Sequence, residues 1–500
     1  MSSRARSSHR PLRWGTALAL VCLLLPAGLA HAQDTTDDTQ IEAAVVSIEV
    51  TQQHADWYSP WQGTRPESIE GSGFIIGPGR IITNAHVVSD ARQIIVRLSG
   101  DNQPYFATIE FVGHDTDLAT LHVKDPDFAK GVKPLELGGI PSLRSRVRTY
   151  GYPAGGEKIS RTEGVVSRVQ FITYLHTGAD SHLAVQTDSA INPGNSGGPV
   201  IQDGKVIGVA FQTVTRLSNV GYFIPTPVIK RYLADVKDGS YDGYGDLGVV
   251  TGNLINPAYR QFLGMPDKRL GVVVDKVFPR SSADPLIHAD DVILAVDGVP
   301  VLSDGTIHYY GYSLSYQQVV EQKQLGDNVK VTLWRHGKQM DVDFPLKRFP
   351  DANRMREQFD ERPPYFIYAG LVFMNLNREY LDTFGNFWAN ADKPLLYEHF
   401  FASMESDQPY PGAVVLSRVL PASLNSAYTG MVNTLVKSLN GVPIHTLRDL
   451  ETGLRASKGG YHVLELEPGD VLLVLSKSAA DAANPVILQR YGITKDRNLP

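Results

Sequence analysis

Short apolar runs alternate with turn signals from Ile41 to about Leu233, and no long helical periodicity interrupts them. Strands that are bounded by Gly, Pro, Asn and Asp at such close spacing are typical of a β-barrel or a β-sandwich. The clearest apolar runs are Phe74-Ile75-Ile76, Ile94-Ile95-Val96, Leu118–Val123 and Val206–Phe211. The sequence therefore predicts a mainly β domain over residues 41–237.

The chain is too long for this domain alone. Five hundred residues exceed what one hydrophobic core can organise, so several domains are expected. A Gly/Asp/Tyr-rich stretch at 238–246 is typical of a linker. Two further blocks, 247–347 and 364–490, each hold a glycine-led apolar strand, a later apolar strand and then Asp-Gly or Asn-Gly, with a charged linker at 348–363 between them.

Residues 1–32 have the parts of a secretory signal peptide. Four arginines precede an apolar run from about Ala17 to Leu29, and Ala30-His31-Ala32 supplies small residues for cleavage. The run is shorter than the roughly 20 residues of a membrane-spanning helix, although an uncleaved anchor is the alternative. We expect export to the periplasm or the extracellular space, with cleavage near Ala32 and a polar lead-in at 33–40.

The single cysteine and the net charge exclude several functions. Cys22 lies inside the apolar run, so the chain after Ala32 has no cysteine, and disulfides, thiolate metal sites and a cysteine nucleophile are excluded there. Without the four arginines of residues 1–32, 43 basic residues face 53 acidic ones, a net charge of −10. No Lys/Arg run stands out, so nucleic acid is not expected as a partner.

A serine among glycines is the first candidate catalytic group. In Gly194-Asn195-Ser196-Gly197-Gly198-Pro199 the glycines allow a tight turn that exposes the Ser196 hydroxyl. The same turn can aim the N–H groups of Gly194 and Ser196 at one point, so Gly194, Asn195 and Ser196 form the candidate oxyanion hole. Such donors stabilise charge that develops only in the transition state. Taken alone, this cluster is also typical of a plain turn.

A histidine and an aspartate complete the candidate triad. His86 follows the strand-like Ile81-Ile82 among small and apolar residues, a setting for a neutral imidazole that acts as general base. Asp117 opens an apolar strand and can accept a bond from the far side of that imidazole, whereas Asp115 is expected to form a turn. The chain order His86, Asp117, Ser196 is that of the chymotrypsin-like double β-barrel, so we predict a serine endopeptidase of that fold.

The first block resembles the HtrA/Deg (DegP-like) serine proteases. The resemblance is carried by these stretches, which span the whole block: Gly71-Ser72-Gly73-Phe74-Ile75-Ile76, Thr83-Asn84-Ala85-His86-Val87-Val88, Asp117-Leu118-Ala119, Gly151-Tyr152-Pro153, Asp188 to Pro199, and Gly221-Tyr222-Phe223-Ile224-Pro225. Tyr365 to Phe373 resembles the divergent second PDZ domain of the Deg9-type branch. The predicted architecture is thus a protease domain followed by two PDZ-like domains, which are α+β and partly open barrels.

The resemblance also implies a function and partners. It implies ATP-independent degradation of misfolded or unfolded proteins as quality control, without metal or cofactor, by a homotrimer or a multiple of trimers. Its PDZ domains bind peptides or C-termini by adding a strand to a sheet edge, with backbone N–H groups capturing the carboxylate. By position, Leu270-Gly271-Val272-Val273 would form that carboxylate loop in the first PDZ domain.

The residue six before the nucleophile indicates substrate preference. In chymotrypsin-like folds this residue lies at the base of the primary pocket, and here it is the uncharged Ala190. We therefore expect cleavage after small or medium apolar residues such as Val, Ala or Ile. These residues are buried in folded proteins, so accessibility would select unfolded clients. A non-catalytic, PDZ-based chaperone or adaptor that retains a protease fold is the alternative.

Overall fold

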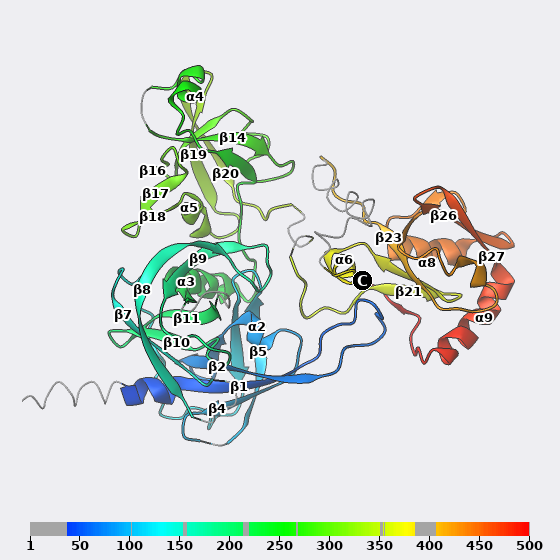
Figure 1. Ribbon diagram of the computed structural model, residues 1–500, viewed down its shortest axis with the longest axis horizontal. Helices are drawn as coiled ribbons and strands as arrows, with labels where there is room; N and C mark the ends of the chain where they lie inside the picture. The colour runs from blue at the N-terminus through cyan, green and yellow to red at the C-terminus, as the bar shows by residue number, and fades with distance from the viewer. Residues whose placement is uncertain are drawn as a thin grey trace, which may run out of the picture.

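The computed structural model describes most of the chain in three lobes (Figure 1). The described residues are 38–101, 103–153, 158–213, 220–266, 269–350, 354, 356–385 and 407–499. The predicted signal peptide and residues 33–37 of the lead-in lie outside them. Residues 38–44 are helical and lead directly into the first strand. Within the described ranges, none of the helices combines the length and apolarity that a membrane crossing requires.

The first lobe consists of two closed six-stranded barrels, as the sequence predicts. The first barrel runs in the order β1 (Val45–Gln52), β2 (Glu67–Gly77), β3 (Arg80–Thr83), β6 (Leu118–Val123), β5 (Tyr105–Gly113), β4 (Ala91–Leu98). The second runs in the order β10 (Pro199–Gln202), β11 (Lys205–Thr213), β12 (Gly221–Pro225), β9 (Ser181–Thr187), β8 (Ser160–Thr173), β7 (Arg146–Gly151). The mainly β, double-barrel prediction is confirmed.

Period-two alternation places one apolar face of each strand inside its barrel. In β1, Val46, Ile48 and Val50 are buried, and they share a core with Ile81 of β3 and Leu121 of β6. Closure leaves neither barrel with a free sheet edge. The helix α3 (Thr226–Asp235) follows the second barrel and continues into the short 3₁₀ helix η1 (Val236–Asp238).

The middle lobe is one antiparallel sheet with two short helices. Its strand order is β13 (Val249–Gly252), β14 (Val272–Val277), β15 (Val292–Val296), β19 (Asn328–Arg335), β20 (Lys338–Pro345), and β16 (Val299–Pro300) pairs with β15. A hairpin, β17 (Thr306–Tyr309) and β18 (Tyr312–Ser315), stands apart from the sheet. The helices are α4 (Pro257–Phe262) and α5 (Gln317–Glu321). Strand β13 is an edge strand, whereas β14 is paired on both sides.

The third lobe is built on a larger sheet. Its strands run in the order β27 (Val471–Ser476), β26 (Tyr461–Glu467), β24 (Thr434–Leu439), β23 (Val414–Val419), β22 (Leu371–Asn375), β21 (Tyr365–Tyr368), β28 (Arg497–Asn498), with β25 (Val442–Pro443) beside β24. Its helices are α6 (Arg378–Asp382), η4 (Ser426–Tyr428), α8 (Leu447–Ala456) and α9 (Lys477–Arg490). In α8, a capping box of Thr446 and Asp449 starts the helix, and Leu447, Leu450 and Leu454 form its buried stripe.

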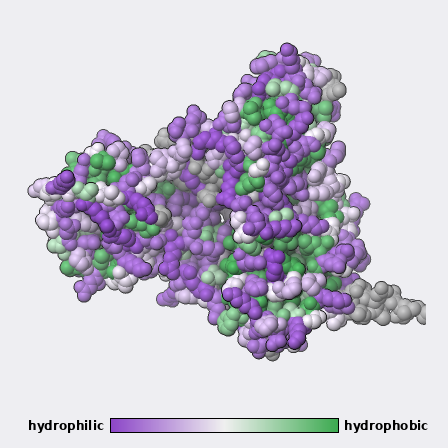
Figure 2. Space-filling view, turned by 180° about the vertical axis from the view of Figure 1, so that it is seen from behind, coloured by the Kyte–Doolittle hydropathy of each residue, from purple (hydrophilic) through white to green (hydrophobic). Residues whose placement is uncertain are grey.

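The surface of the three lobes is mixed in polarity. Seen from behind, hydrophilic residues cover most of it, and hydrophobic patches lie on the double-barrel lobe and near the far end of the middle lobe (Figure 2). At that far end, Phe262 of α4 is 84% exposed. Single exposed apolar residues are normal on protein surfaces, so the exposure of Phe262 alone does not mark a binding site.

Candidate active site

The structure brings His86 and Asp117 into direct contact. His86 lies in the four-residue helix α2 (Ala85–Val88), and its Nδ1 lies 2.7 Å from Oδ2 and 3.0 Å from Oδ1 of Asp117. The backbone N–H of His86 also donates to Oδ1 at 2.9 Å. Two bonds from the same histidine therefore hold the carboxylate in line with Nδ1, which leaves Nε2 as the proton acceptor.

A turn rather than a strand presents the aspartate. Asp117 N–H donates to His114 O at 3.2 Å, and Asp117 has a positive φ of 51°, so it ends a turn immediately before β6. Asn84 Nδ2 donates to the Asp117 carbonyl at 2.8 Å. Asn and Asp adopt this backbone region more readily than most residues, because their short polar side chains bond locally.

The pair favours a charged imidazole during reaction. Burial alone would lower the pKa of His86, but the adjacent Asp117 carboxylate outweighs it and raises that pKa above its ordinary value. Burial likewise opposes ionisation of Asp117, but the neighbouring His86 dominates and lowers the pKa of Asp117. Asp117 therefore stays ionised while His86 gains and loses a proton, which is the division of roles that general-base catalysis needs.

The loop that carries Ser196 has the geometry of a tight turn. Asn195 N–H donates to Asn192 O at 2.9 Å across Pro193 and Gly194, and Gly194 has a φ of 94°. Proline followed by a residue with positive φ is the pattern of a type II turn, and glycine adopts that φ without strain. The glycine-rich sequence thus sets the backbone path into Ser196, the candidate nucleophile.

Two unpaired N–H groups flank the nucleophile. In the described part of the chain, the backbone N–H groups of Gly194 and Ser196 have no hydrogen-bond acceptor. The N–H of Asn195, which the sequence analysis also placed in the oxyanion hole, is bound to Asn192 O. The candidate hole therefore has two donors, from Gly194 and Ser196, and the Asn195 N–H is not available to it in this conformation.

The Ser196 hydroxyl does not contact His86 in this structure. Its Oγ donates to the carbonyl of Phe211 at 3.4 Å, and no hydrogen bond of 3.5 Å or less joins it to His86 within the described residues. Catalytic hydrogen bonds are often long or misaligned in free enzymes and form in the substrate complex.

Ser72 is a residue of the site that sequence reasoning missed. Its Oγ donates to Gly194 O at 2.7 Å and accepts from Tyr152 N–H at 2.8 Å, and its N–H donates to Ser196 O at 2.8 Å. Ser72 lies in β2 of the first barrel and is fully buried. The only sequence signal for it was its place between Gly71 and Gly73, which leaves its partner 122 residues away unspecified.

The candidate specificity residue is exposed beside the loop. Ala190 is exposed, and its carbonyl accepts from Thr162 Oγ1 at 3.0 Å. The nearby Asp188 uses Oδ1 to accept Val165 N–H at 2.6 Å, so its carboxylate is bound to β8. In the described part of the chain, no group of three or more His, Cys, Asp and Glu side chains is placed to hold a metal ion.

The predicted peptide-carboxylate loop in the middle lobe does not lead into a strand with a free edge. The predicted loop runs into β14, whose first residues are Val272 and Val273. This strand is paired with β13 on one side and with β15 on the other. The N–H of Gly271 is also bound, to Val301 O at 2.8 Å. Strand addition requires a free edge, which β13 has and β14 lacks. Apolar runs of similar composition do not show which strand lies at the edge.

Comparisons with known proteins agree with this geometry. The trypsin-like peptidase domain family model matches residues 71–209, and the PDZ domain family model matches residues 355–499. A solved HtrA-type protease, AlgW with a tripeptide, has the same fold over 63% of this chain and 98% of its own, with a TM-score of 0.50 and 24% identity.

Two plant proteins are similar over most of the chain. Protease Do-like 2, chloroplastic, of Arabidopsis thaliana is 36% identical over 467 residues, which cover 92% of this chain and 76% of the relative. Protease Do-like 4, mitochondrial, of the same plant is 35% identical over 436 residues, covering 87% of this chain and 80% of the relative. The chain therefore belongs to the HtrA/Deg family of serine endopeptidases, with a trypsin-like peptidase domain and a PDZ domain.

Proposed function

We propose that His86, Asp117 and Ser196 are the catalytic triad of this endopeptidase. The observation that supports this most directly is the His86–Asp117 pair, in which Nδ1 lies within hydrogen-bond distance of both carboxylate oxygens. Ser196 Oγ attacks the peptide carbonyl carbon and gives its proton to His86 Nε2. The carbonyl oxygen becomes an oxyanion that accepts the N–H groups of Gly194 and Ser196.

The second half of the reaction uses the same groups. His86 donates its proton to the leaving amine nitrogen as the C–N bond breaks, which leaves an acyl ester on Ser196 Oγ. A water molecule then gives a proton to His86 Nε2 and attacks the ester, and the serine is regenerated with release of the acid. Asp117 keeps the imidazole in the tautomer that accepts at Nε2 throughout.

We further propose that the clients are unfolded polypeptides cut after small or medium apolar residues. The support is the uncharged Ala190 at the expected base of the primary pocket, with Asp188 bound to the backbone of Val165. Cleavage needs no ATP, because the protein only selects chains whose apolar residues are already accessible. The signal-like residues 1–32 favour export to the cell envelope, and the family favours a homotrimer or a multiple of trimers.

A second candidate function is peptide binding without proteolysis, as a PDZ-based chaperone or adaptor. It is favoured by one observation, the bond from Ser196 Oγ to the Phe211 carbonyl instead of to His86. A nucleophile fixed in that position would leave a protease fold without turnover.

Casein turnover by the full chain, compared with Ser196→Ala, separates the two functions. The proteolytic function requires turnover by the wild type and loss of several orders of magnitude in the variant. Equal turnover, or covalent labelling by a fluorophosphonate at a residue other than Ser196, would contradict it. A peptide library then tests the preference, which fails if Lys or Arg dominates at the residue before the cut.

A further inference from the structure

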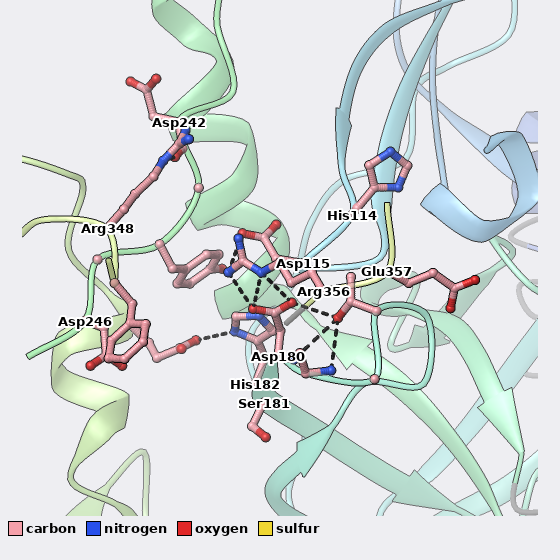
Figure 3. A pocket seen from close by; sticks show the side chains of 18 of the residues that line it. His114, Asp115, Asp180, Ser181, His182, Asp242, Asp246, Arg348, Arg356 and Glu357 are labelled. Atoms are coloured by element: carbon pink, nitrogen blue, oxygen red, sulfur yellow. Dashed lines mark hydrogen bonds and ion pairs between the residues drawn. The ribbon is translucent and has the colours of Figure 1, made fainter. Parts of the chain in front are cut away.

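The charged segment between the middle and third lobes lies on the protease domain. Arg356 donates from Nε and a terminal nitrogen to both carboxylate oxygens of Asp180, at 2.5–2.9 Å, and lies 3.9 Å from Asp115. Figure 3 shows this guanidinium reaching between the two aspartates. Bidentate arginine–carboxylate pairs fix orientation as well as distance. The N–H of Glu357 adds a bond to Thr177 O at 3.4 Å.

The other end of the segment bonds to residues close in sequence to both His86 and Asp117. Asp360 accepts Asp90 N–H at 2.5 Å, and its own N–H donates to Asp90 Oδ1 at 2.9 Å. Its second carboxylate oxygen lies 3.0 Å from His114 Nε2. Asp90 is four residues beyond His86, and His114 is three residues before Asp117. A single carboxylate therefore bonds to both Asp90 and His114.

Between these ends, Phe359 forms an aromatic stack that reaches the catalytic imidazole. The rings of Phe359 and His176 are parallel to within 15°, with centroids 4.0 Å apart. His176 in turn lies 6.2 Å from the His86 ring, within the range of aromatic contacts. His114 joins the stack at 5.0 Å from Phe359. The order is Phe359, His176, His86, so the segment reaches the catalytic ring through one intervening imidazole, which is tilted by 54° to the His86 ring.

Burial in this stack also keeps His176, the ring next to His86, uncharged near neutral pH. Burial lowers the pKa of His176 to about 4, so this ring is neutral near pH 7. The charged or titratable groups around it are Asp117 and His86 of the catalytic pair, His114 of the β5–β6 turn, and Asp360 of the segment. His114 Nδ1 lies 2.9 Å from His176 Nε2, so the two rings are within hydrogen-bond distance. A neutral neighbour does not oppose the imidazolium that hydrolysis forms on His86.

A large cavity opens beside this contact. It has a volume of about 750 Å³ and is lined by loops of the protease domain, by α5 and the lead into β13, and by the segment itself (Figure 3). His114, Asp115 and Arg356 line it, whereas His86, Asp117 and Ser196 do not. The cavity is therefore distinct from the catalytic pair, and the segment forms part of its wall.

We propose that residues 356–360 belong to the support of the catalytic site, with Phe359 as a positioning residue that holds His176 against His86. This inference rests on the proposed proteolytic function. Because the segment follows the middle lobe, its attachment makes the catalytic rate depend on a part of the chain outside the protease domain. Release of the Arg356–Asp180 pair would withdraw the support.

Phe359→Ala in the full chain tests the proposal with a short chromogenic peptide. We expect kcat to fall by about tenfold with KM little changed, because the variant misplaces His86 without touching the substrate. Phe359→Tyr keeps the ring and is expected to restore the rate. Phe262→Ala removes an aromatic ring that is 84% exposed in the middle lobe, and serves as the matched control.

The pH profile separates a positioning role from a merely structural one. Without Phe359, His176 is less buried and its pKa rises, so it becomes protonated as pH falls from 8 to 5.5 and opposes charge on His86. That positive charge lowers the pKa of His86, so more of His86 stays neutral at acidic pH and the ratio of variant to wild-type kcat is expected to rise as pH falls. A ratio that is constant with pH, or an unchanged kcat, would overturn the proposal.

Arg356→Gln removes the ion pair that anchors the other end of the segment. It provides an independent test of the same proposal if Phe359→Ala does not fold. We expect a similar loss of kcat, and a double variant no slower than the worse single variant, because both changes release one support. Additive losses would contradict this. If the wild type itself shows no turnover, the proteolytic function fails. If the wild type is active and the variants are as fast as the wild type, the proteolytic function stands and only the positioning role of the segment is contradicted.

Discussion

Ser72 Oγ donates a 2.7 Å hydrogen bond to the carbonyl of Gly194, which joins the first barrel to the loop that carries the nucleophile in the second. The same hydroxyl accepts Tyr152 N–H, and the Ser72 backbone bonds Ser196 O. The proposed triad is thus divided between two barrels, with His86 and Asp117 on one and Ser196 on the other. Ser72 therefore holds the Ser196 loop of the second barrel against β2 of the first barrel, which also carries His86 and Asp117.

Ser72→Ala is expected to lower kcat by about 10- to 100-fold, because the Gly194 turn loses its anchor and the oxyanion donors shift. Two partners of the hydroxyl become unpaired in a buried place, so the free energy of unfolding should also fall by about 1–3 kcal/mol. Active-site titration and urea unfolding measure the two effects. Ser145→Ala removes another hydroxyl that bonds within its own loop, to Ser142 O, and should change neither quantity. A wild-type kcat in Ser72→Ala would show that the bond does not position the loop.

The parts of this site that the sequence predicts are those encoded in short local patterns. His86 lies in the short helix that follows β3, Asp117 ends a turn before β6, and Ser196 stands among glycines that a tight turn requires. Their contact then follows from the closed barrel, because β3 and β6 are paired neighbours. The rotamer of Ser196 could not be predicted in this way, because a serine side chain has several staggered rotamers and the local sequence does not select one of them.

The features that the sequence did not predict depend on distant partners. Leu270–Val273 has the composition of a peptide-binding strand, but strand order places it inside the sheet and β13 at the edge. Residues 348–363 have the charge of a solvated linker, yet Arg356 pairs with Asp180, 176 residues earlier in the chain. Local composition specifies neither strand order nor the partner of a charge.

Asp117→Asn tests the electrostatics of the catalytic pair. Activity requires neutral His86, and Asp117 raises the pKa of His86 above about 6.5, so wild-type kcat/KM should decline as pH falls through a value above 6.5. The variant loses that contribution, so its acidic decline should move to lower pH while its plateau falls by about 10⁴-fold. A pH profile of peptide hydrolysis measures both. An acidic limb that stays in place would mean that another group sets it.

Gly197→Ala, compared with Gly204→Ala, separates the effect of a steric clash in the Ser196 loop from the effect of a positive φ. Gly197 has a φ of 86°, and a Cβ there would lie 2.0 Å from the Ser72 carbonyl oxygen, so the alanine must displace backbone. Gly204→Ala has a similar φ of 72° but meets open space. Both should lose about 1–2 kcal/mol from the left-handed conformation, and only Gly197→Ala should also lose fluorophosphonate labelling of Ser196. Normal labelling of Gly197→Ala would show that the loop tolerates the shift.

A buried arginine should control the attachment of the middle lobe. Arg231 and Asp235 of α3 form an ion pair whose side chains are 2% and 1% exposed. Arg231 also donates from Nε to Lys323 O at 3.0 Å and from a terminal nitrogen to Gly243 O at 2.7 Å. Arg231→Met removes these bonds and leaves Asp235 charged and buried, which should cost about 3–5 kcal/mol.

Combining Arg231→Met with Asp235→Leu should recover part of that loss, because no uncompensated charge remains. Recovery is incomplete, since the N–H groups of Asp242 and Gly243, at 2.7 and 3.2 Å from the Asp235 carboxylate, lose their acceptor. Urea unfolding gives the two free energies, and limited proteolysis between residues 238 and 246 reports detachment of the middle lobe. If the double variant is less stable than Arg231→Met, the peptide N–H bonds of Asp235 outweigh its ion pair as the attachment of this linker.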